Sequence, residues 1–121
     1  RVDRALGEVF SRLRIDPARV AVAGFSDGAT YALGLGLANG ELFDRILAFS
    51  PGFVPPGPRS GQPAVFVSHG TADEVLPIDR TSRDLVPELR DDGYEVTYRE
   101  FDGGHAVPPE ITQEAVDRLG W

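Results

Sequence analysis

Four short apolar runs alternate with stretches of helical periodicity, and this alternation constrains the fold more than any other feature of the chain. The apolar runs lie at residues 20–23, 46–49, 64–67 and 96–101, and the helical stretches lie at residues 1–14, 29–39, 79–92 and 108–119. Short runs rich in Val, Ile and Phe are typical of buried strands. Strands that alternate with helices predict an α/β fold, in which a parallel sheet of about four strands carries helices on both faces.

The remaining segments give no sign of a second domain. Residues 51–63 are dense in proline and glycine and are predicted to form an irregular loop. A length of 121 residues suits one small domain with a modest core, so we expect residues 1–121 to form a single domain. The chain begins at Arg1, without a methionine or a signal-like apolar stretch, and we expect that its start is truncated.

The composition argues against several classes of partner. A net charge of −7 disfavours nucleic acid, which needs a basic face, and an anionic membrane surface. No apolar run approaches the length of a membrane span. The chain has no cysteine, which removes disulfides, thiolate metal sites and a cysteine nucleophile. We expect no cofactor, and the lack of cysteine and of a signal segment favours a cytoplasmic location.

A G-x-S-x-G motif, Gly24-Phe25-Ser26-Asp27-Gly28, follows the first apolar run directly and leads into a helical stretch. A serine on a sharp strand-to-helix turn has its hydroxyl pushed clear of the sheet, which is the geometry of a nucleophile elbow. A side chain at either flanking glycine is expected to collide across so tight a turn. The motif and its position therefore predict that Ser26 is a nucleophile.

A serine hydroxyl needs a base to take its proton, and the base needs an acid to hold its tautomer. The chain offers His69 and His105 as bases. Two glycines before His105 let the backbone carry its ring back over the sheet, whereas His69 stands at a turn where a histidine more often bonds to backbone. The order serine, aspartate, histidine that accompanies this kind of turn favours His105 and leaves His69 as the alternative.

Asp73 is the favoured acid because it follows the third apolar run closely enough to reach a histidine on the neighbouring loop. A turn aspartate bonded to its own backbone is the competing interpretation of Asp73. Glu74, Asp79 and Asp102 are alternative acids in weaker positions. Because the carboxyl ends of parallel strands share one edge of a sheet, the nucleophile, acid and base are expected to meet there.

An oxyanion formed at Ser26 needs hydrogen-bond donors aimed at it. The backbone N–H of Asp27 is one candidate, because it stands at the start of a helix whose positive end favours negative charge. The Asp27 side chain is interpreted as an N-terminal helix charge and not as a reactant. A second donor is expected from a loop earlier in the fold, for which the chain shows no counterpart.

Taken in order, these motifs resemble the α/β-hydrolase fold, and specifically serine esterases of the carboxylesterase/phospholipase (acyl-thioesterase-like) family. The matching stretches are Gly24-Phe25-Ser26-Asp27-Gly28-Ala29, Ala48-Phe49-Ser50-Pro51-Gly52, His69-Gly70-Thr71-Ala72-Asp73 with Val75-Leu76-Pro77, and Gly103-Gly104-His105. The resemblance covers nearly the whole chain. It implies nucleophile Ser26, acid Asp73 and base His105, with an ester or thioester as substrate.

The family's domain is longer than this chain, which resembles its C-terminal half only. The other half would add a strand beside residues 20–23 and the loop that supplies the second oxyanion donor. We therefore expect a bare apolar strand edge, which favours association of the chain with itself or with a separate N-terminal half. Loss of one oxyanion donor is expected to lower turnover by about a hundred- to a thousandfold.

The loops near the predicted site bear on the shape of a substrate pocket. The loop at 51–63 is too short for a separate cap domain, so we expect an open site. Apolar residues near the predicted site either line an acyl groove or belong to the core: Phe25, Phe53, Val54, Val75, Leu76 and Val107.

The leading hypothesis is a serine esterase that acts on a small ester or thioester through an acyl-enzyme on Ser26. The alternatives are a non-catalytic or weakly active half-domain that associates through its sheet edge, and a serine peptidase of the same fold. A metal hydrolase that uses His69, Asp73 and His105 is the least favoured, because two histidines leave little choice of ligands.

Overall fold

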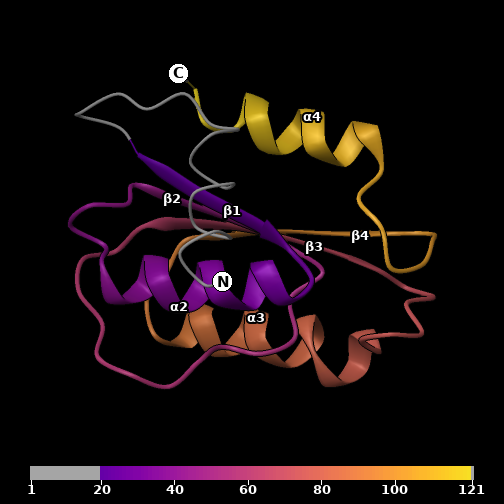
Figure 1. Cartoon of the computed structure of the whole chain (residues 1–121), viewed down its shortest axis with the longest axis horizontal. Coiled ribbons are helices and arrows are strands. Elements are labelled where there is room, and N and C mark those ends of the chain that lie inside the picture. The colour runs from indigo at the N-terminus through magenta and orange to yellow at the C-terminus, as the bar shows by residue number, and fades with distance from the viewer. Residues whose placement is uncertain (1–19, 121) are drawn as a thin grey trace.

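The computed structural model describes residues 20–120, which fold into a parallel sheet with helices against it (Figure 1). The predicted helix at residues 1–14 lies outside the described residues. The elements are β1 (Ala21–Phe25), α2 (Asp27–Ala38), β2 (Arg45–Phe49), β3 (Ala64–Gly70), the 3₁₀ helix η1 (Ile78–Arg80), α3 (Ser82–Asp91), β4 (Val96–Phe101) and α4 (Pro109–Asp117).

The sheet has the order β1-β2-β3-β4, and each neighbouring pair of strands is parallel. Parallel neighbours need a crossover connection. Helix α2 connects β1 to β2, residues 50–63 connect β2 to β3, and α3 lies between β3 and β4. All four strands therefore end at the same edge of the sheet, as the sequence predicted.

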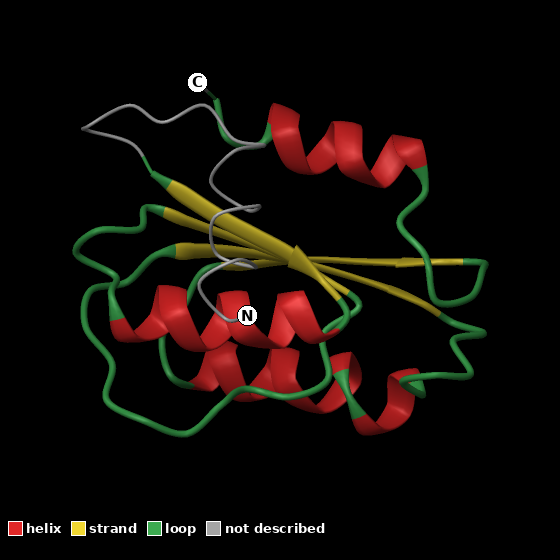
Figure 2. Cartoon of the chain, viewed as in Figure 1, coloured by secondary structure: helices red, strands yellow, loops and turns green. Residues whose placement is uncertain are grey.

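Helices cover both faces of the sheet, which confirms the predicted layers (Figure 2). Alternate strand residues point to opposite faces. On one face, the β-strand residues Val22, Ile46 and Val67 pack with residues of α2 and α3. On the other face, Leu47 and Phe66 pack with residues of α4.

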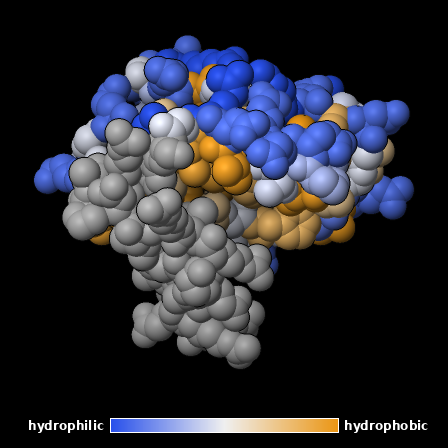
Figure 3. Space-filling model, turned by 90° about the horizontal axis from the view of Figure 1, so that it is seen from above, coloured by the Kyte–Doolittle hydropathy of each residue, from blue (hydrophilic) through white to orange (hydrophobic). Residues whose placement is uncertain are grey.

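Helix α4 lies across the second face with its apolar side turned inward. Ile111 and Ala115 are buried, while Glu110 and Arg118 are exposed. Seen from above, hydrophilic residues cover the upper part of the view, and hydrophobic residues gather in the middle and at the lower right (Figure 3). Between residues 20 and 120, no helix combines the length and the apolar character that a membrane crossing needs.

The predicted helix at residues 79–92 is interrupted, and this is the main difference between the predicted and the observed elements. Thr81 separates η1 from α3, with φ −127° and ψ −100°. Its hydroxyl donates to the Pro77 carbonyl at 2.9 Å. The bond ties the Thr81 side chain to the residue before η1, and the non-helical backbone of Thr81 separates the two helices.

Strand β3 is longer than the apolar run at residues 64–67 predicts. Ser68, His69 and Gly70 continue the strand, because they pair with residues 99–101 of β4. The sequence pattern ended at the first polar residue, although pairing with a neighbouring strand does not require an apolar side chain.

Candidate active site

Ser26 occupies a strained turn between β1 and α2. Its backbone has φ 61° and ψ −120°, a conformation that a residue other than glycine adopts only when its surroundings impose it. The Ser26 N–H donates to the Phe49 carbonyl at 2.9 Å. The Ser26 carbonyl accepts from the N–H groups of Ala29 and Thr30 at 3.0 and 3.2 Å. The turn is thus held from β2 on one side and from α2 on the other.

The two glycines of the motif have different roles. A Cβ at Gly24 would overlap the backbone of Gly28, so this position requires glycine. Apart from its chain neighbours and the backbone of its own helix, a Cβ at Gly28 would meet no heavy atom within 4 Å. The expectation that a side chain at Gly28 collides across the turn is therefore wrong, because only the strand side of the turn is crowded.

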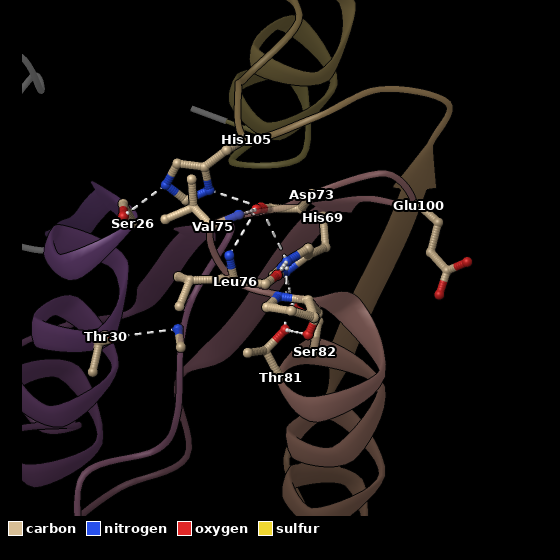
Figure 4. Close-up of polar contacts among 12 residues, drawn as sticks. Ser26, Thr30, His69, Asp73, Val75, Leu76, Thr81, Ser82, Glu100 and His105 are labelled. Carbon is tan, nitrogen blue, oxygen red and sulfur yellow. Dashed lines mark hydrogen bonds and ion pairs between the residues drawn. The ribbon is translucent and has the colours of Figure 1, made fainter.

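His105 lies between Ser26 and Asp73 (Figure 4). Its Nε2 is 2.8 Å from Ser26 Oγ, and its Nδ1 is 2.7 Å from Asp73 Oδ2. A carboxylate can only accept, so Nδ1 carries the proton and Nε2 accepts from the serine hydroxyl. The His105 ring also packs against the Phe25 ring, with centroids 4.7 Å apart.

The loop that carries His105 passes directly over the end of β3. A Cβ at Gly70 would overlap the carbonyl oxygens of Gly103 and Gly104. The Ala72 N–H donates to the Gly103 carbonyl at 2.9 Å. The absence of a side chain at Gly70 is therefore what lets this loop approach β3, a requirement that sequence reasoning placed only on the two glycines before His105.

The Asp73 carboxylate is buried, and both of its oxygens accept hydrogen bonds. Its Oδ1 accepts from the N–H groups of Val75 and Leu76 at 2.9 and 2.8 Å. Burial acts to raise the pKa of Asp73, but the Leu76 N–H and the His105 ring outweigh it and hold the pKa below its ordinary value. The backbone bonds expected of a turn aspartate are present, together with the bond to His105.

The carboxylate that contacts His105 is that of Asp73, and not that of an alternative acid. Glu74, Asp79 and Asp102 are all exposed, and Asp79 pairs with Arg83 at 2.7 Å. The alternative base, His69, is buried, with its ring nitrogens 2.7 Å from the Leu76 carbonyl and from the Ser82 hydroxyl. Sequence reasoning missed Ser82, because nothing in the pattern of α3 indicates that this residue faces a histidine.

The backbone N–H of Asp27 stands at the first position of α2, where an N–H has no partner within the helix. The Asp27 side chain is exposed, as expected for a charge at a helix N-terminus. Within residues 20–120, no group of three or more His, Asp and Glu side chains is arranged to hold a metal ion.

Three of the apolar residues predicted near the site are exposed. The exposed fractions of Phe25, Phe53 and Val75 are 42%, 60% and 65%. Leu76 is half-buried, and Val107 packs against the cluster beneath α4. The Gly52 N–H donates to Thr30 Oγ1 at 2.9 Å and ties the loop that carries Phe53 to α2.

The family model described as Phospholipase/Carboxylesterase matches residues 2–119. The chain belongs to the phospholipase/carboxylesterase family. No curated protein sequence matches the chain.

Solved structures of esterases share the fold of this family member. Esterase PE8 is 30% identical with a TM-score of 0.78, over 98% of this chain and 57% of that chain. A phospholipase/carboxylesterase from Dyadobacter fermentans is 26% identical with a TM-score of 0.71, over 99% and 64%. The Bacillus cereus carboxylesterase is 21% identical with a TM-score of 0.73, over 98% and 55%. The chain thus spans less than two thirds of each of these proteins.

Proposed function

We propose that this chain is a serine hydrolase that cleaves carboxylic esters or thioesters through an acyl-enzyme on Ser26. The observation that carries the proposal is the position of His105, with Nε2 2.8 Å from Ser26 Oγ and Nδ1 2.7 Å from Asp73 Oδ2. Membership of the phospholipase/carboxylesterase family supports the choice of substrate. In this proposal Ser26 is the nucleophile, His105 the base and Asp73 the acid.

The reaction begins when the Ser26 hydroxyl gives its proton to His105 Nε2 and its oxygen attacks the ester carbonyl carbon. The oxyanion that forms faces the Asp27 N–H at the positive end of α2. The carbonyl re-forms, the bond to the leaving alcohol or thiol breaks, and the leaving group takes the proton from His105. Water then gives a proton to His105 Nε2 and its oxygen attacks the acyl carbon. The bond from that carbon to Ser26 Oγ breaks, Oγ takes the proton back from His105, and the carboxylic acid leaves.

The exposed apolar residues near the proposed triad support an apolar acyl or leaving group as the preferred substrate. Phe25 ends β1 directly before Ser26, Val75 and Leu76 follow Asp73 on its loop, and Phe53 lies on the loop after β2. Phe25, Phe53 and Val75 expose large apolar surfaces. Covering such surfaces with a ligand is favourable by about 25 cal/mol per Å². We place Val107 at the back of this site, where it also packs with the core.

The test is labelling with a fluorophosphonate probe, followed by measurement of the intact mass. The wild-type chain should gain one probe adduct at Ser26, because the probe reacts with an activated serine. Ser26→Ala should gain none, and His105→Ala should lose the labelling while it keeps its circular dichroism spectrum. A folded wild-type chain that takes up no probe would contradict the proposal.

A second candidate function is association through the edge of β1, in a chain that forms a single partial domain over residues 1–121. It is supported by the share of PE8 that the chain spans, 57%, and by the position of β1 at the end of the described strand order. A free strand edge pairs readily with another chain. Sedimentation at micromolar concentration tests this candidate, and a stable monomer at all concentrations would exclude self-association.

A further inference from the structure

His69 is a buried polar residue to which the proposed reaction gives no role. Its side chain is 0% exposed and lies on β3, between the Asp73 loop and the start of α3 (Figure 4). A buried polar ring costs stability unless its nitrogens have partners. Both nitrogens of His69 have them, so the ring is fixed from two sides.

The neighbours of the ring assign its tautomer. Nε2 is 2.7 Å from the Leu76 carbonyl oxygen, 3.3 Å from Asp73 Oδ2 and 3.4 Å from Thr81 Oγ1. A carbonyl and a carboxylate only accept hydrogen bonds, so Nε2 carries a proton. Nδ1 then accepts from the Ser82 hydroxyl, which is 2.7 Å away.

Leu76 connects this ring to the proposed acid. The Leu76 carbonyl accepts from His69, and the Leu76 N–H donates to Asp73 Oδ1 at 2.8 Å. With Oδ1 held in this way, Oδ2 is directed to His105 at 2.7 Å. An unbroken series of contacts therefore runs from His69 through Leu76 and Asp73 to His105.

The charged residue nearest to His69 on the neighbouring strand is already paired. Glu100 lies opposite His69 in the register of β3 and β4. Its carboxylate accepts from Arg83 at 2.8 and 2.9 Å and from the Tyr98 hydroxyl at 2.7 Å. Arg83 is in turn bound to Asp79 at 2.7 Å. The bonds of His69 are thus directed to the acid loop and to α3.

We infer that His69 is a positioning residue, whose Nε2–H holds the loop at residues 73–76 so that the Asp73 carboxylate faces His105. The inference rests on the proposed function of Ser26, Asp73 and His105. His69 touches none of the reacting atoms and acts through Leu76 and Asp73. Small misplacements of a catalytic group have large effects on rate, so this contact is expected to influence turnover more than substrate binding.

Two amide substitutions separate the nitrogens of the ring. In His69→Gln the side-chain amide reaches the position of Nε2 and donates to the Leu76 carbonyl. In His69→Asn the shorter amide reaches only the position of Nδ1, beside Ser82. With a p-nitrophenyl ester as substrate, we expect His69→Asn to lower kcat by about 10- to 100-fold with little change in KM. We expect His69→Gln to restore kcat to within about threefold of the wild type.

A spectroscopic signal reports the same effect without turnover. The Nδ1 proton of His105, which is hydrogen-bonded to Asp73, should give a far-downfield proton resonance in the wild type. This resonance should weaken in His69→Asn and persist in His69→Gln. Near-UV circular dichroism checks that both variants are folded.

The inference is overturned if folded His69→Asn keeps the kcat and the His105 resonance of the wild type, or if both variants are equally impaired. Nitrogen NMR of the wild-type ring provides a test that needs no variant, and a proton on Nδ1 of His69 instead of Nε2 would also overturn it. Failure of the proposed function looks different. In that case the wild type hydrolyses no ester, while the His105 resonance still decides whether His69 positions Asp73.

Discussion

At the scale of single residues, Asp73 shows how the backbone prepares a side chain for chemistry. Its Oδ1 accepts from two backbone N–H groups, and its Oδ2 accepts from His105. Burial alone would raise the pKa of this carboxyl, but the N–H of Leu76 and the ring of His105 reverse the effect, and the pKa is lowered. Asp73 is therefore ionised at neutral pH, where its carboxylate holds the His105 ring with the proton on Nδ1.

Ionised Asp73 should stabilise the fold in a way that depends on pH. Because its pKa is lowered in the folded state, the stabilisation is complete above the pKa of an unfolded aspartate, about 3.9, and is lost as the pH falls through the folded value. The free energy of unfolding of the wild type should exceed that of Asp73→Asn by an amount that shrinks below about pH 4. Urea unfolding at several pH values measures this, and a difference independent of pH would contradict it.

At the scale of elements, the turn between β1 and α2 depends on one of its two glycines. We expect Gly24→Ala to destabilise the fold by about 3 kcal/mol, because the new methyl group overlaps the backbone of Gly28. Gly28→Ala is the matched control. It meets open space and should be neutral or stabilising by roughly 0.5–1 kcal/mol through higher helix propensity. Urea unfolding of both variants measures the difference, and equal costs would show that the turn is crowded on both sides.

The sequence predicted these elements wherever an apolar pattern coincided with the element. The run at Val96–Phe101 matches β4, and the alternation of strands and helices gave the parallel sheet. The break at Thr81 and the polar end of β3 were not predicted, because a hydroxyl-to-backbone bond and strand pairing leave no periodic signal. Ser26, Asp73 and His105 were predicted as site residues from motifs and their order, whereas the contacts of His69 depend on three-dimensional packing.

At the scale of the whole molecule, the candidate site draws on residues far apart in the sequence. Ser26 follows β1, Asp73 follows β3 and His105 follows β4. The bond between His105 and Ser26 joins residues 79 positions apart, and the bond between His105 and Asp73 joins residues 32 apart. No single segment of the chain therefore contains the site.

Activity and global structure should therefore be lost together. In a urea titration, the rate of fluorophosphonate labelling and the far-UV circular dichroism should share one midpoint. The reason is that the proposed triad comes apart when β1, β3 or β4 leaves the sheet. Both signals can be recorded on the same samples. If labelling disappeared at clearly lower urea while the circular dichroism was unchanged, the loops would open locally before the sheet unfolds, which would contradict the prediction.

The strand order has a consequence for how the proposed chemistry responds to distant changes. Ser26 stands at the end of β1 and His105 follows β4, so three inter-strand spacings of about 4.8 Å separate the strands that carry them. The loop that bears His105 spans this width above Gly70. The 2.8 Å distance between His105 Nε2 and Ser26 Oγ therefore depends on how the four strands are spaced and twisted. We expect a core substitution between β2 and β3 that changes this arrangement to alter reactivity, although it touches no residue of the site.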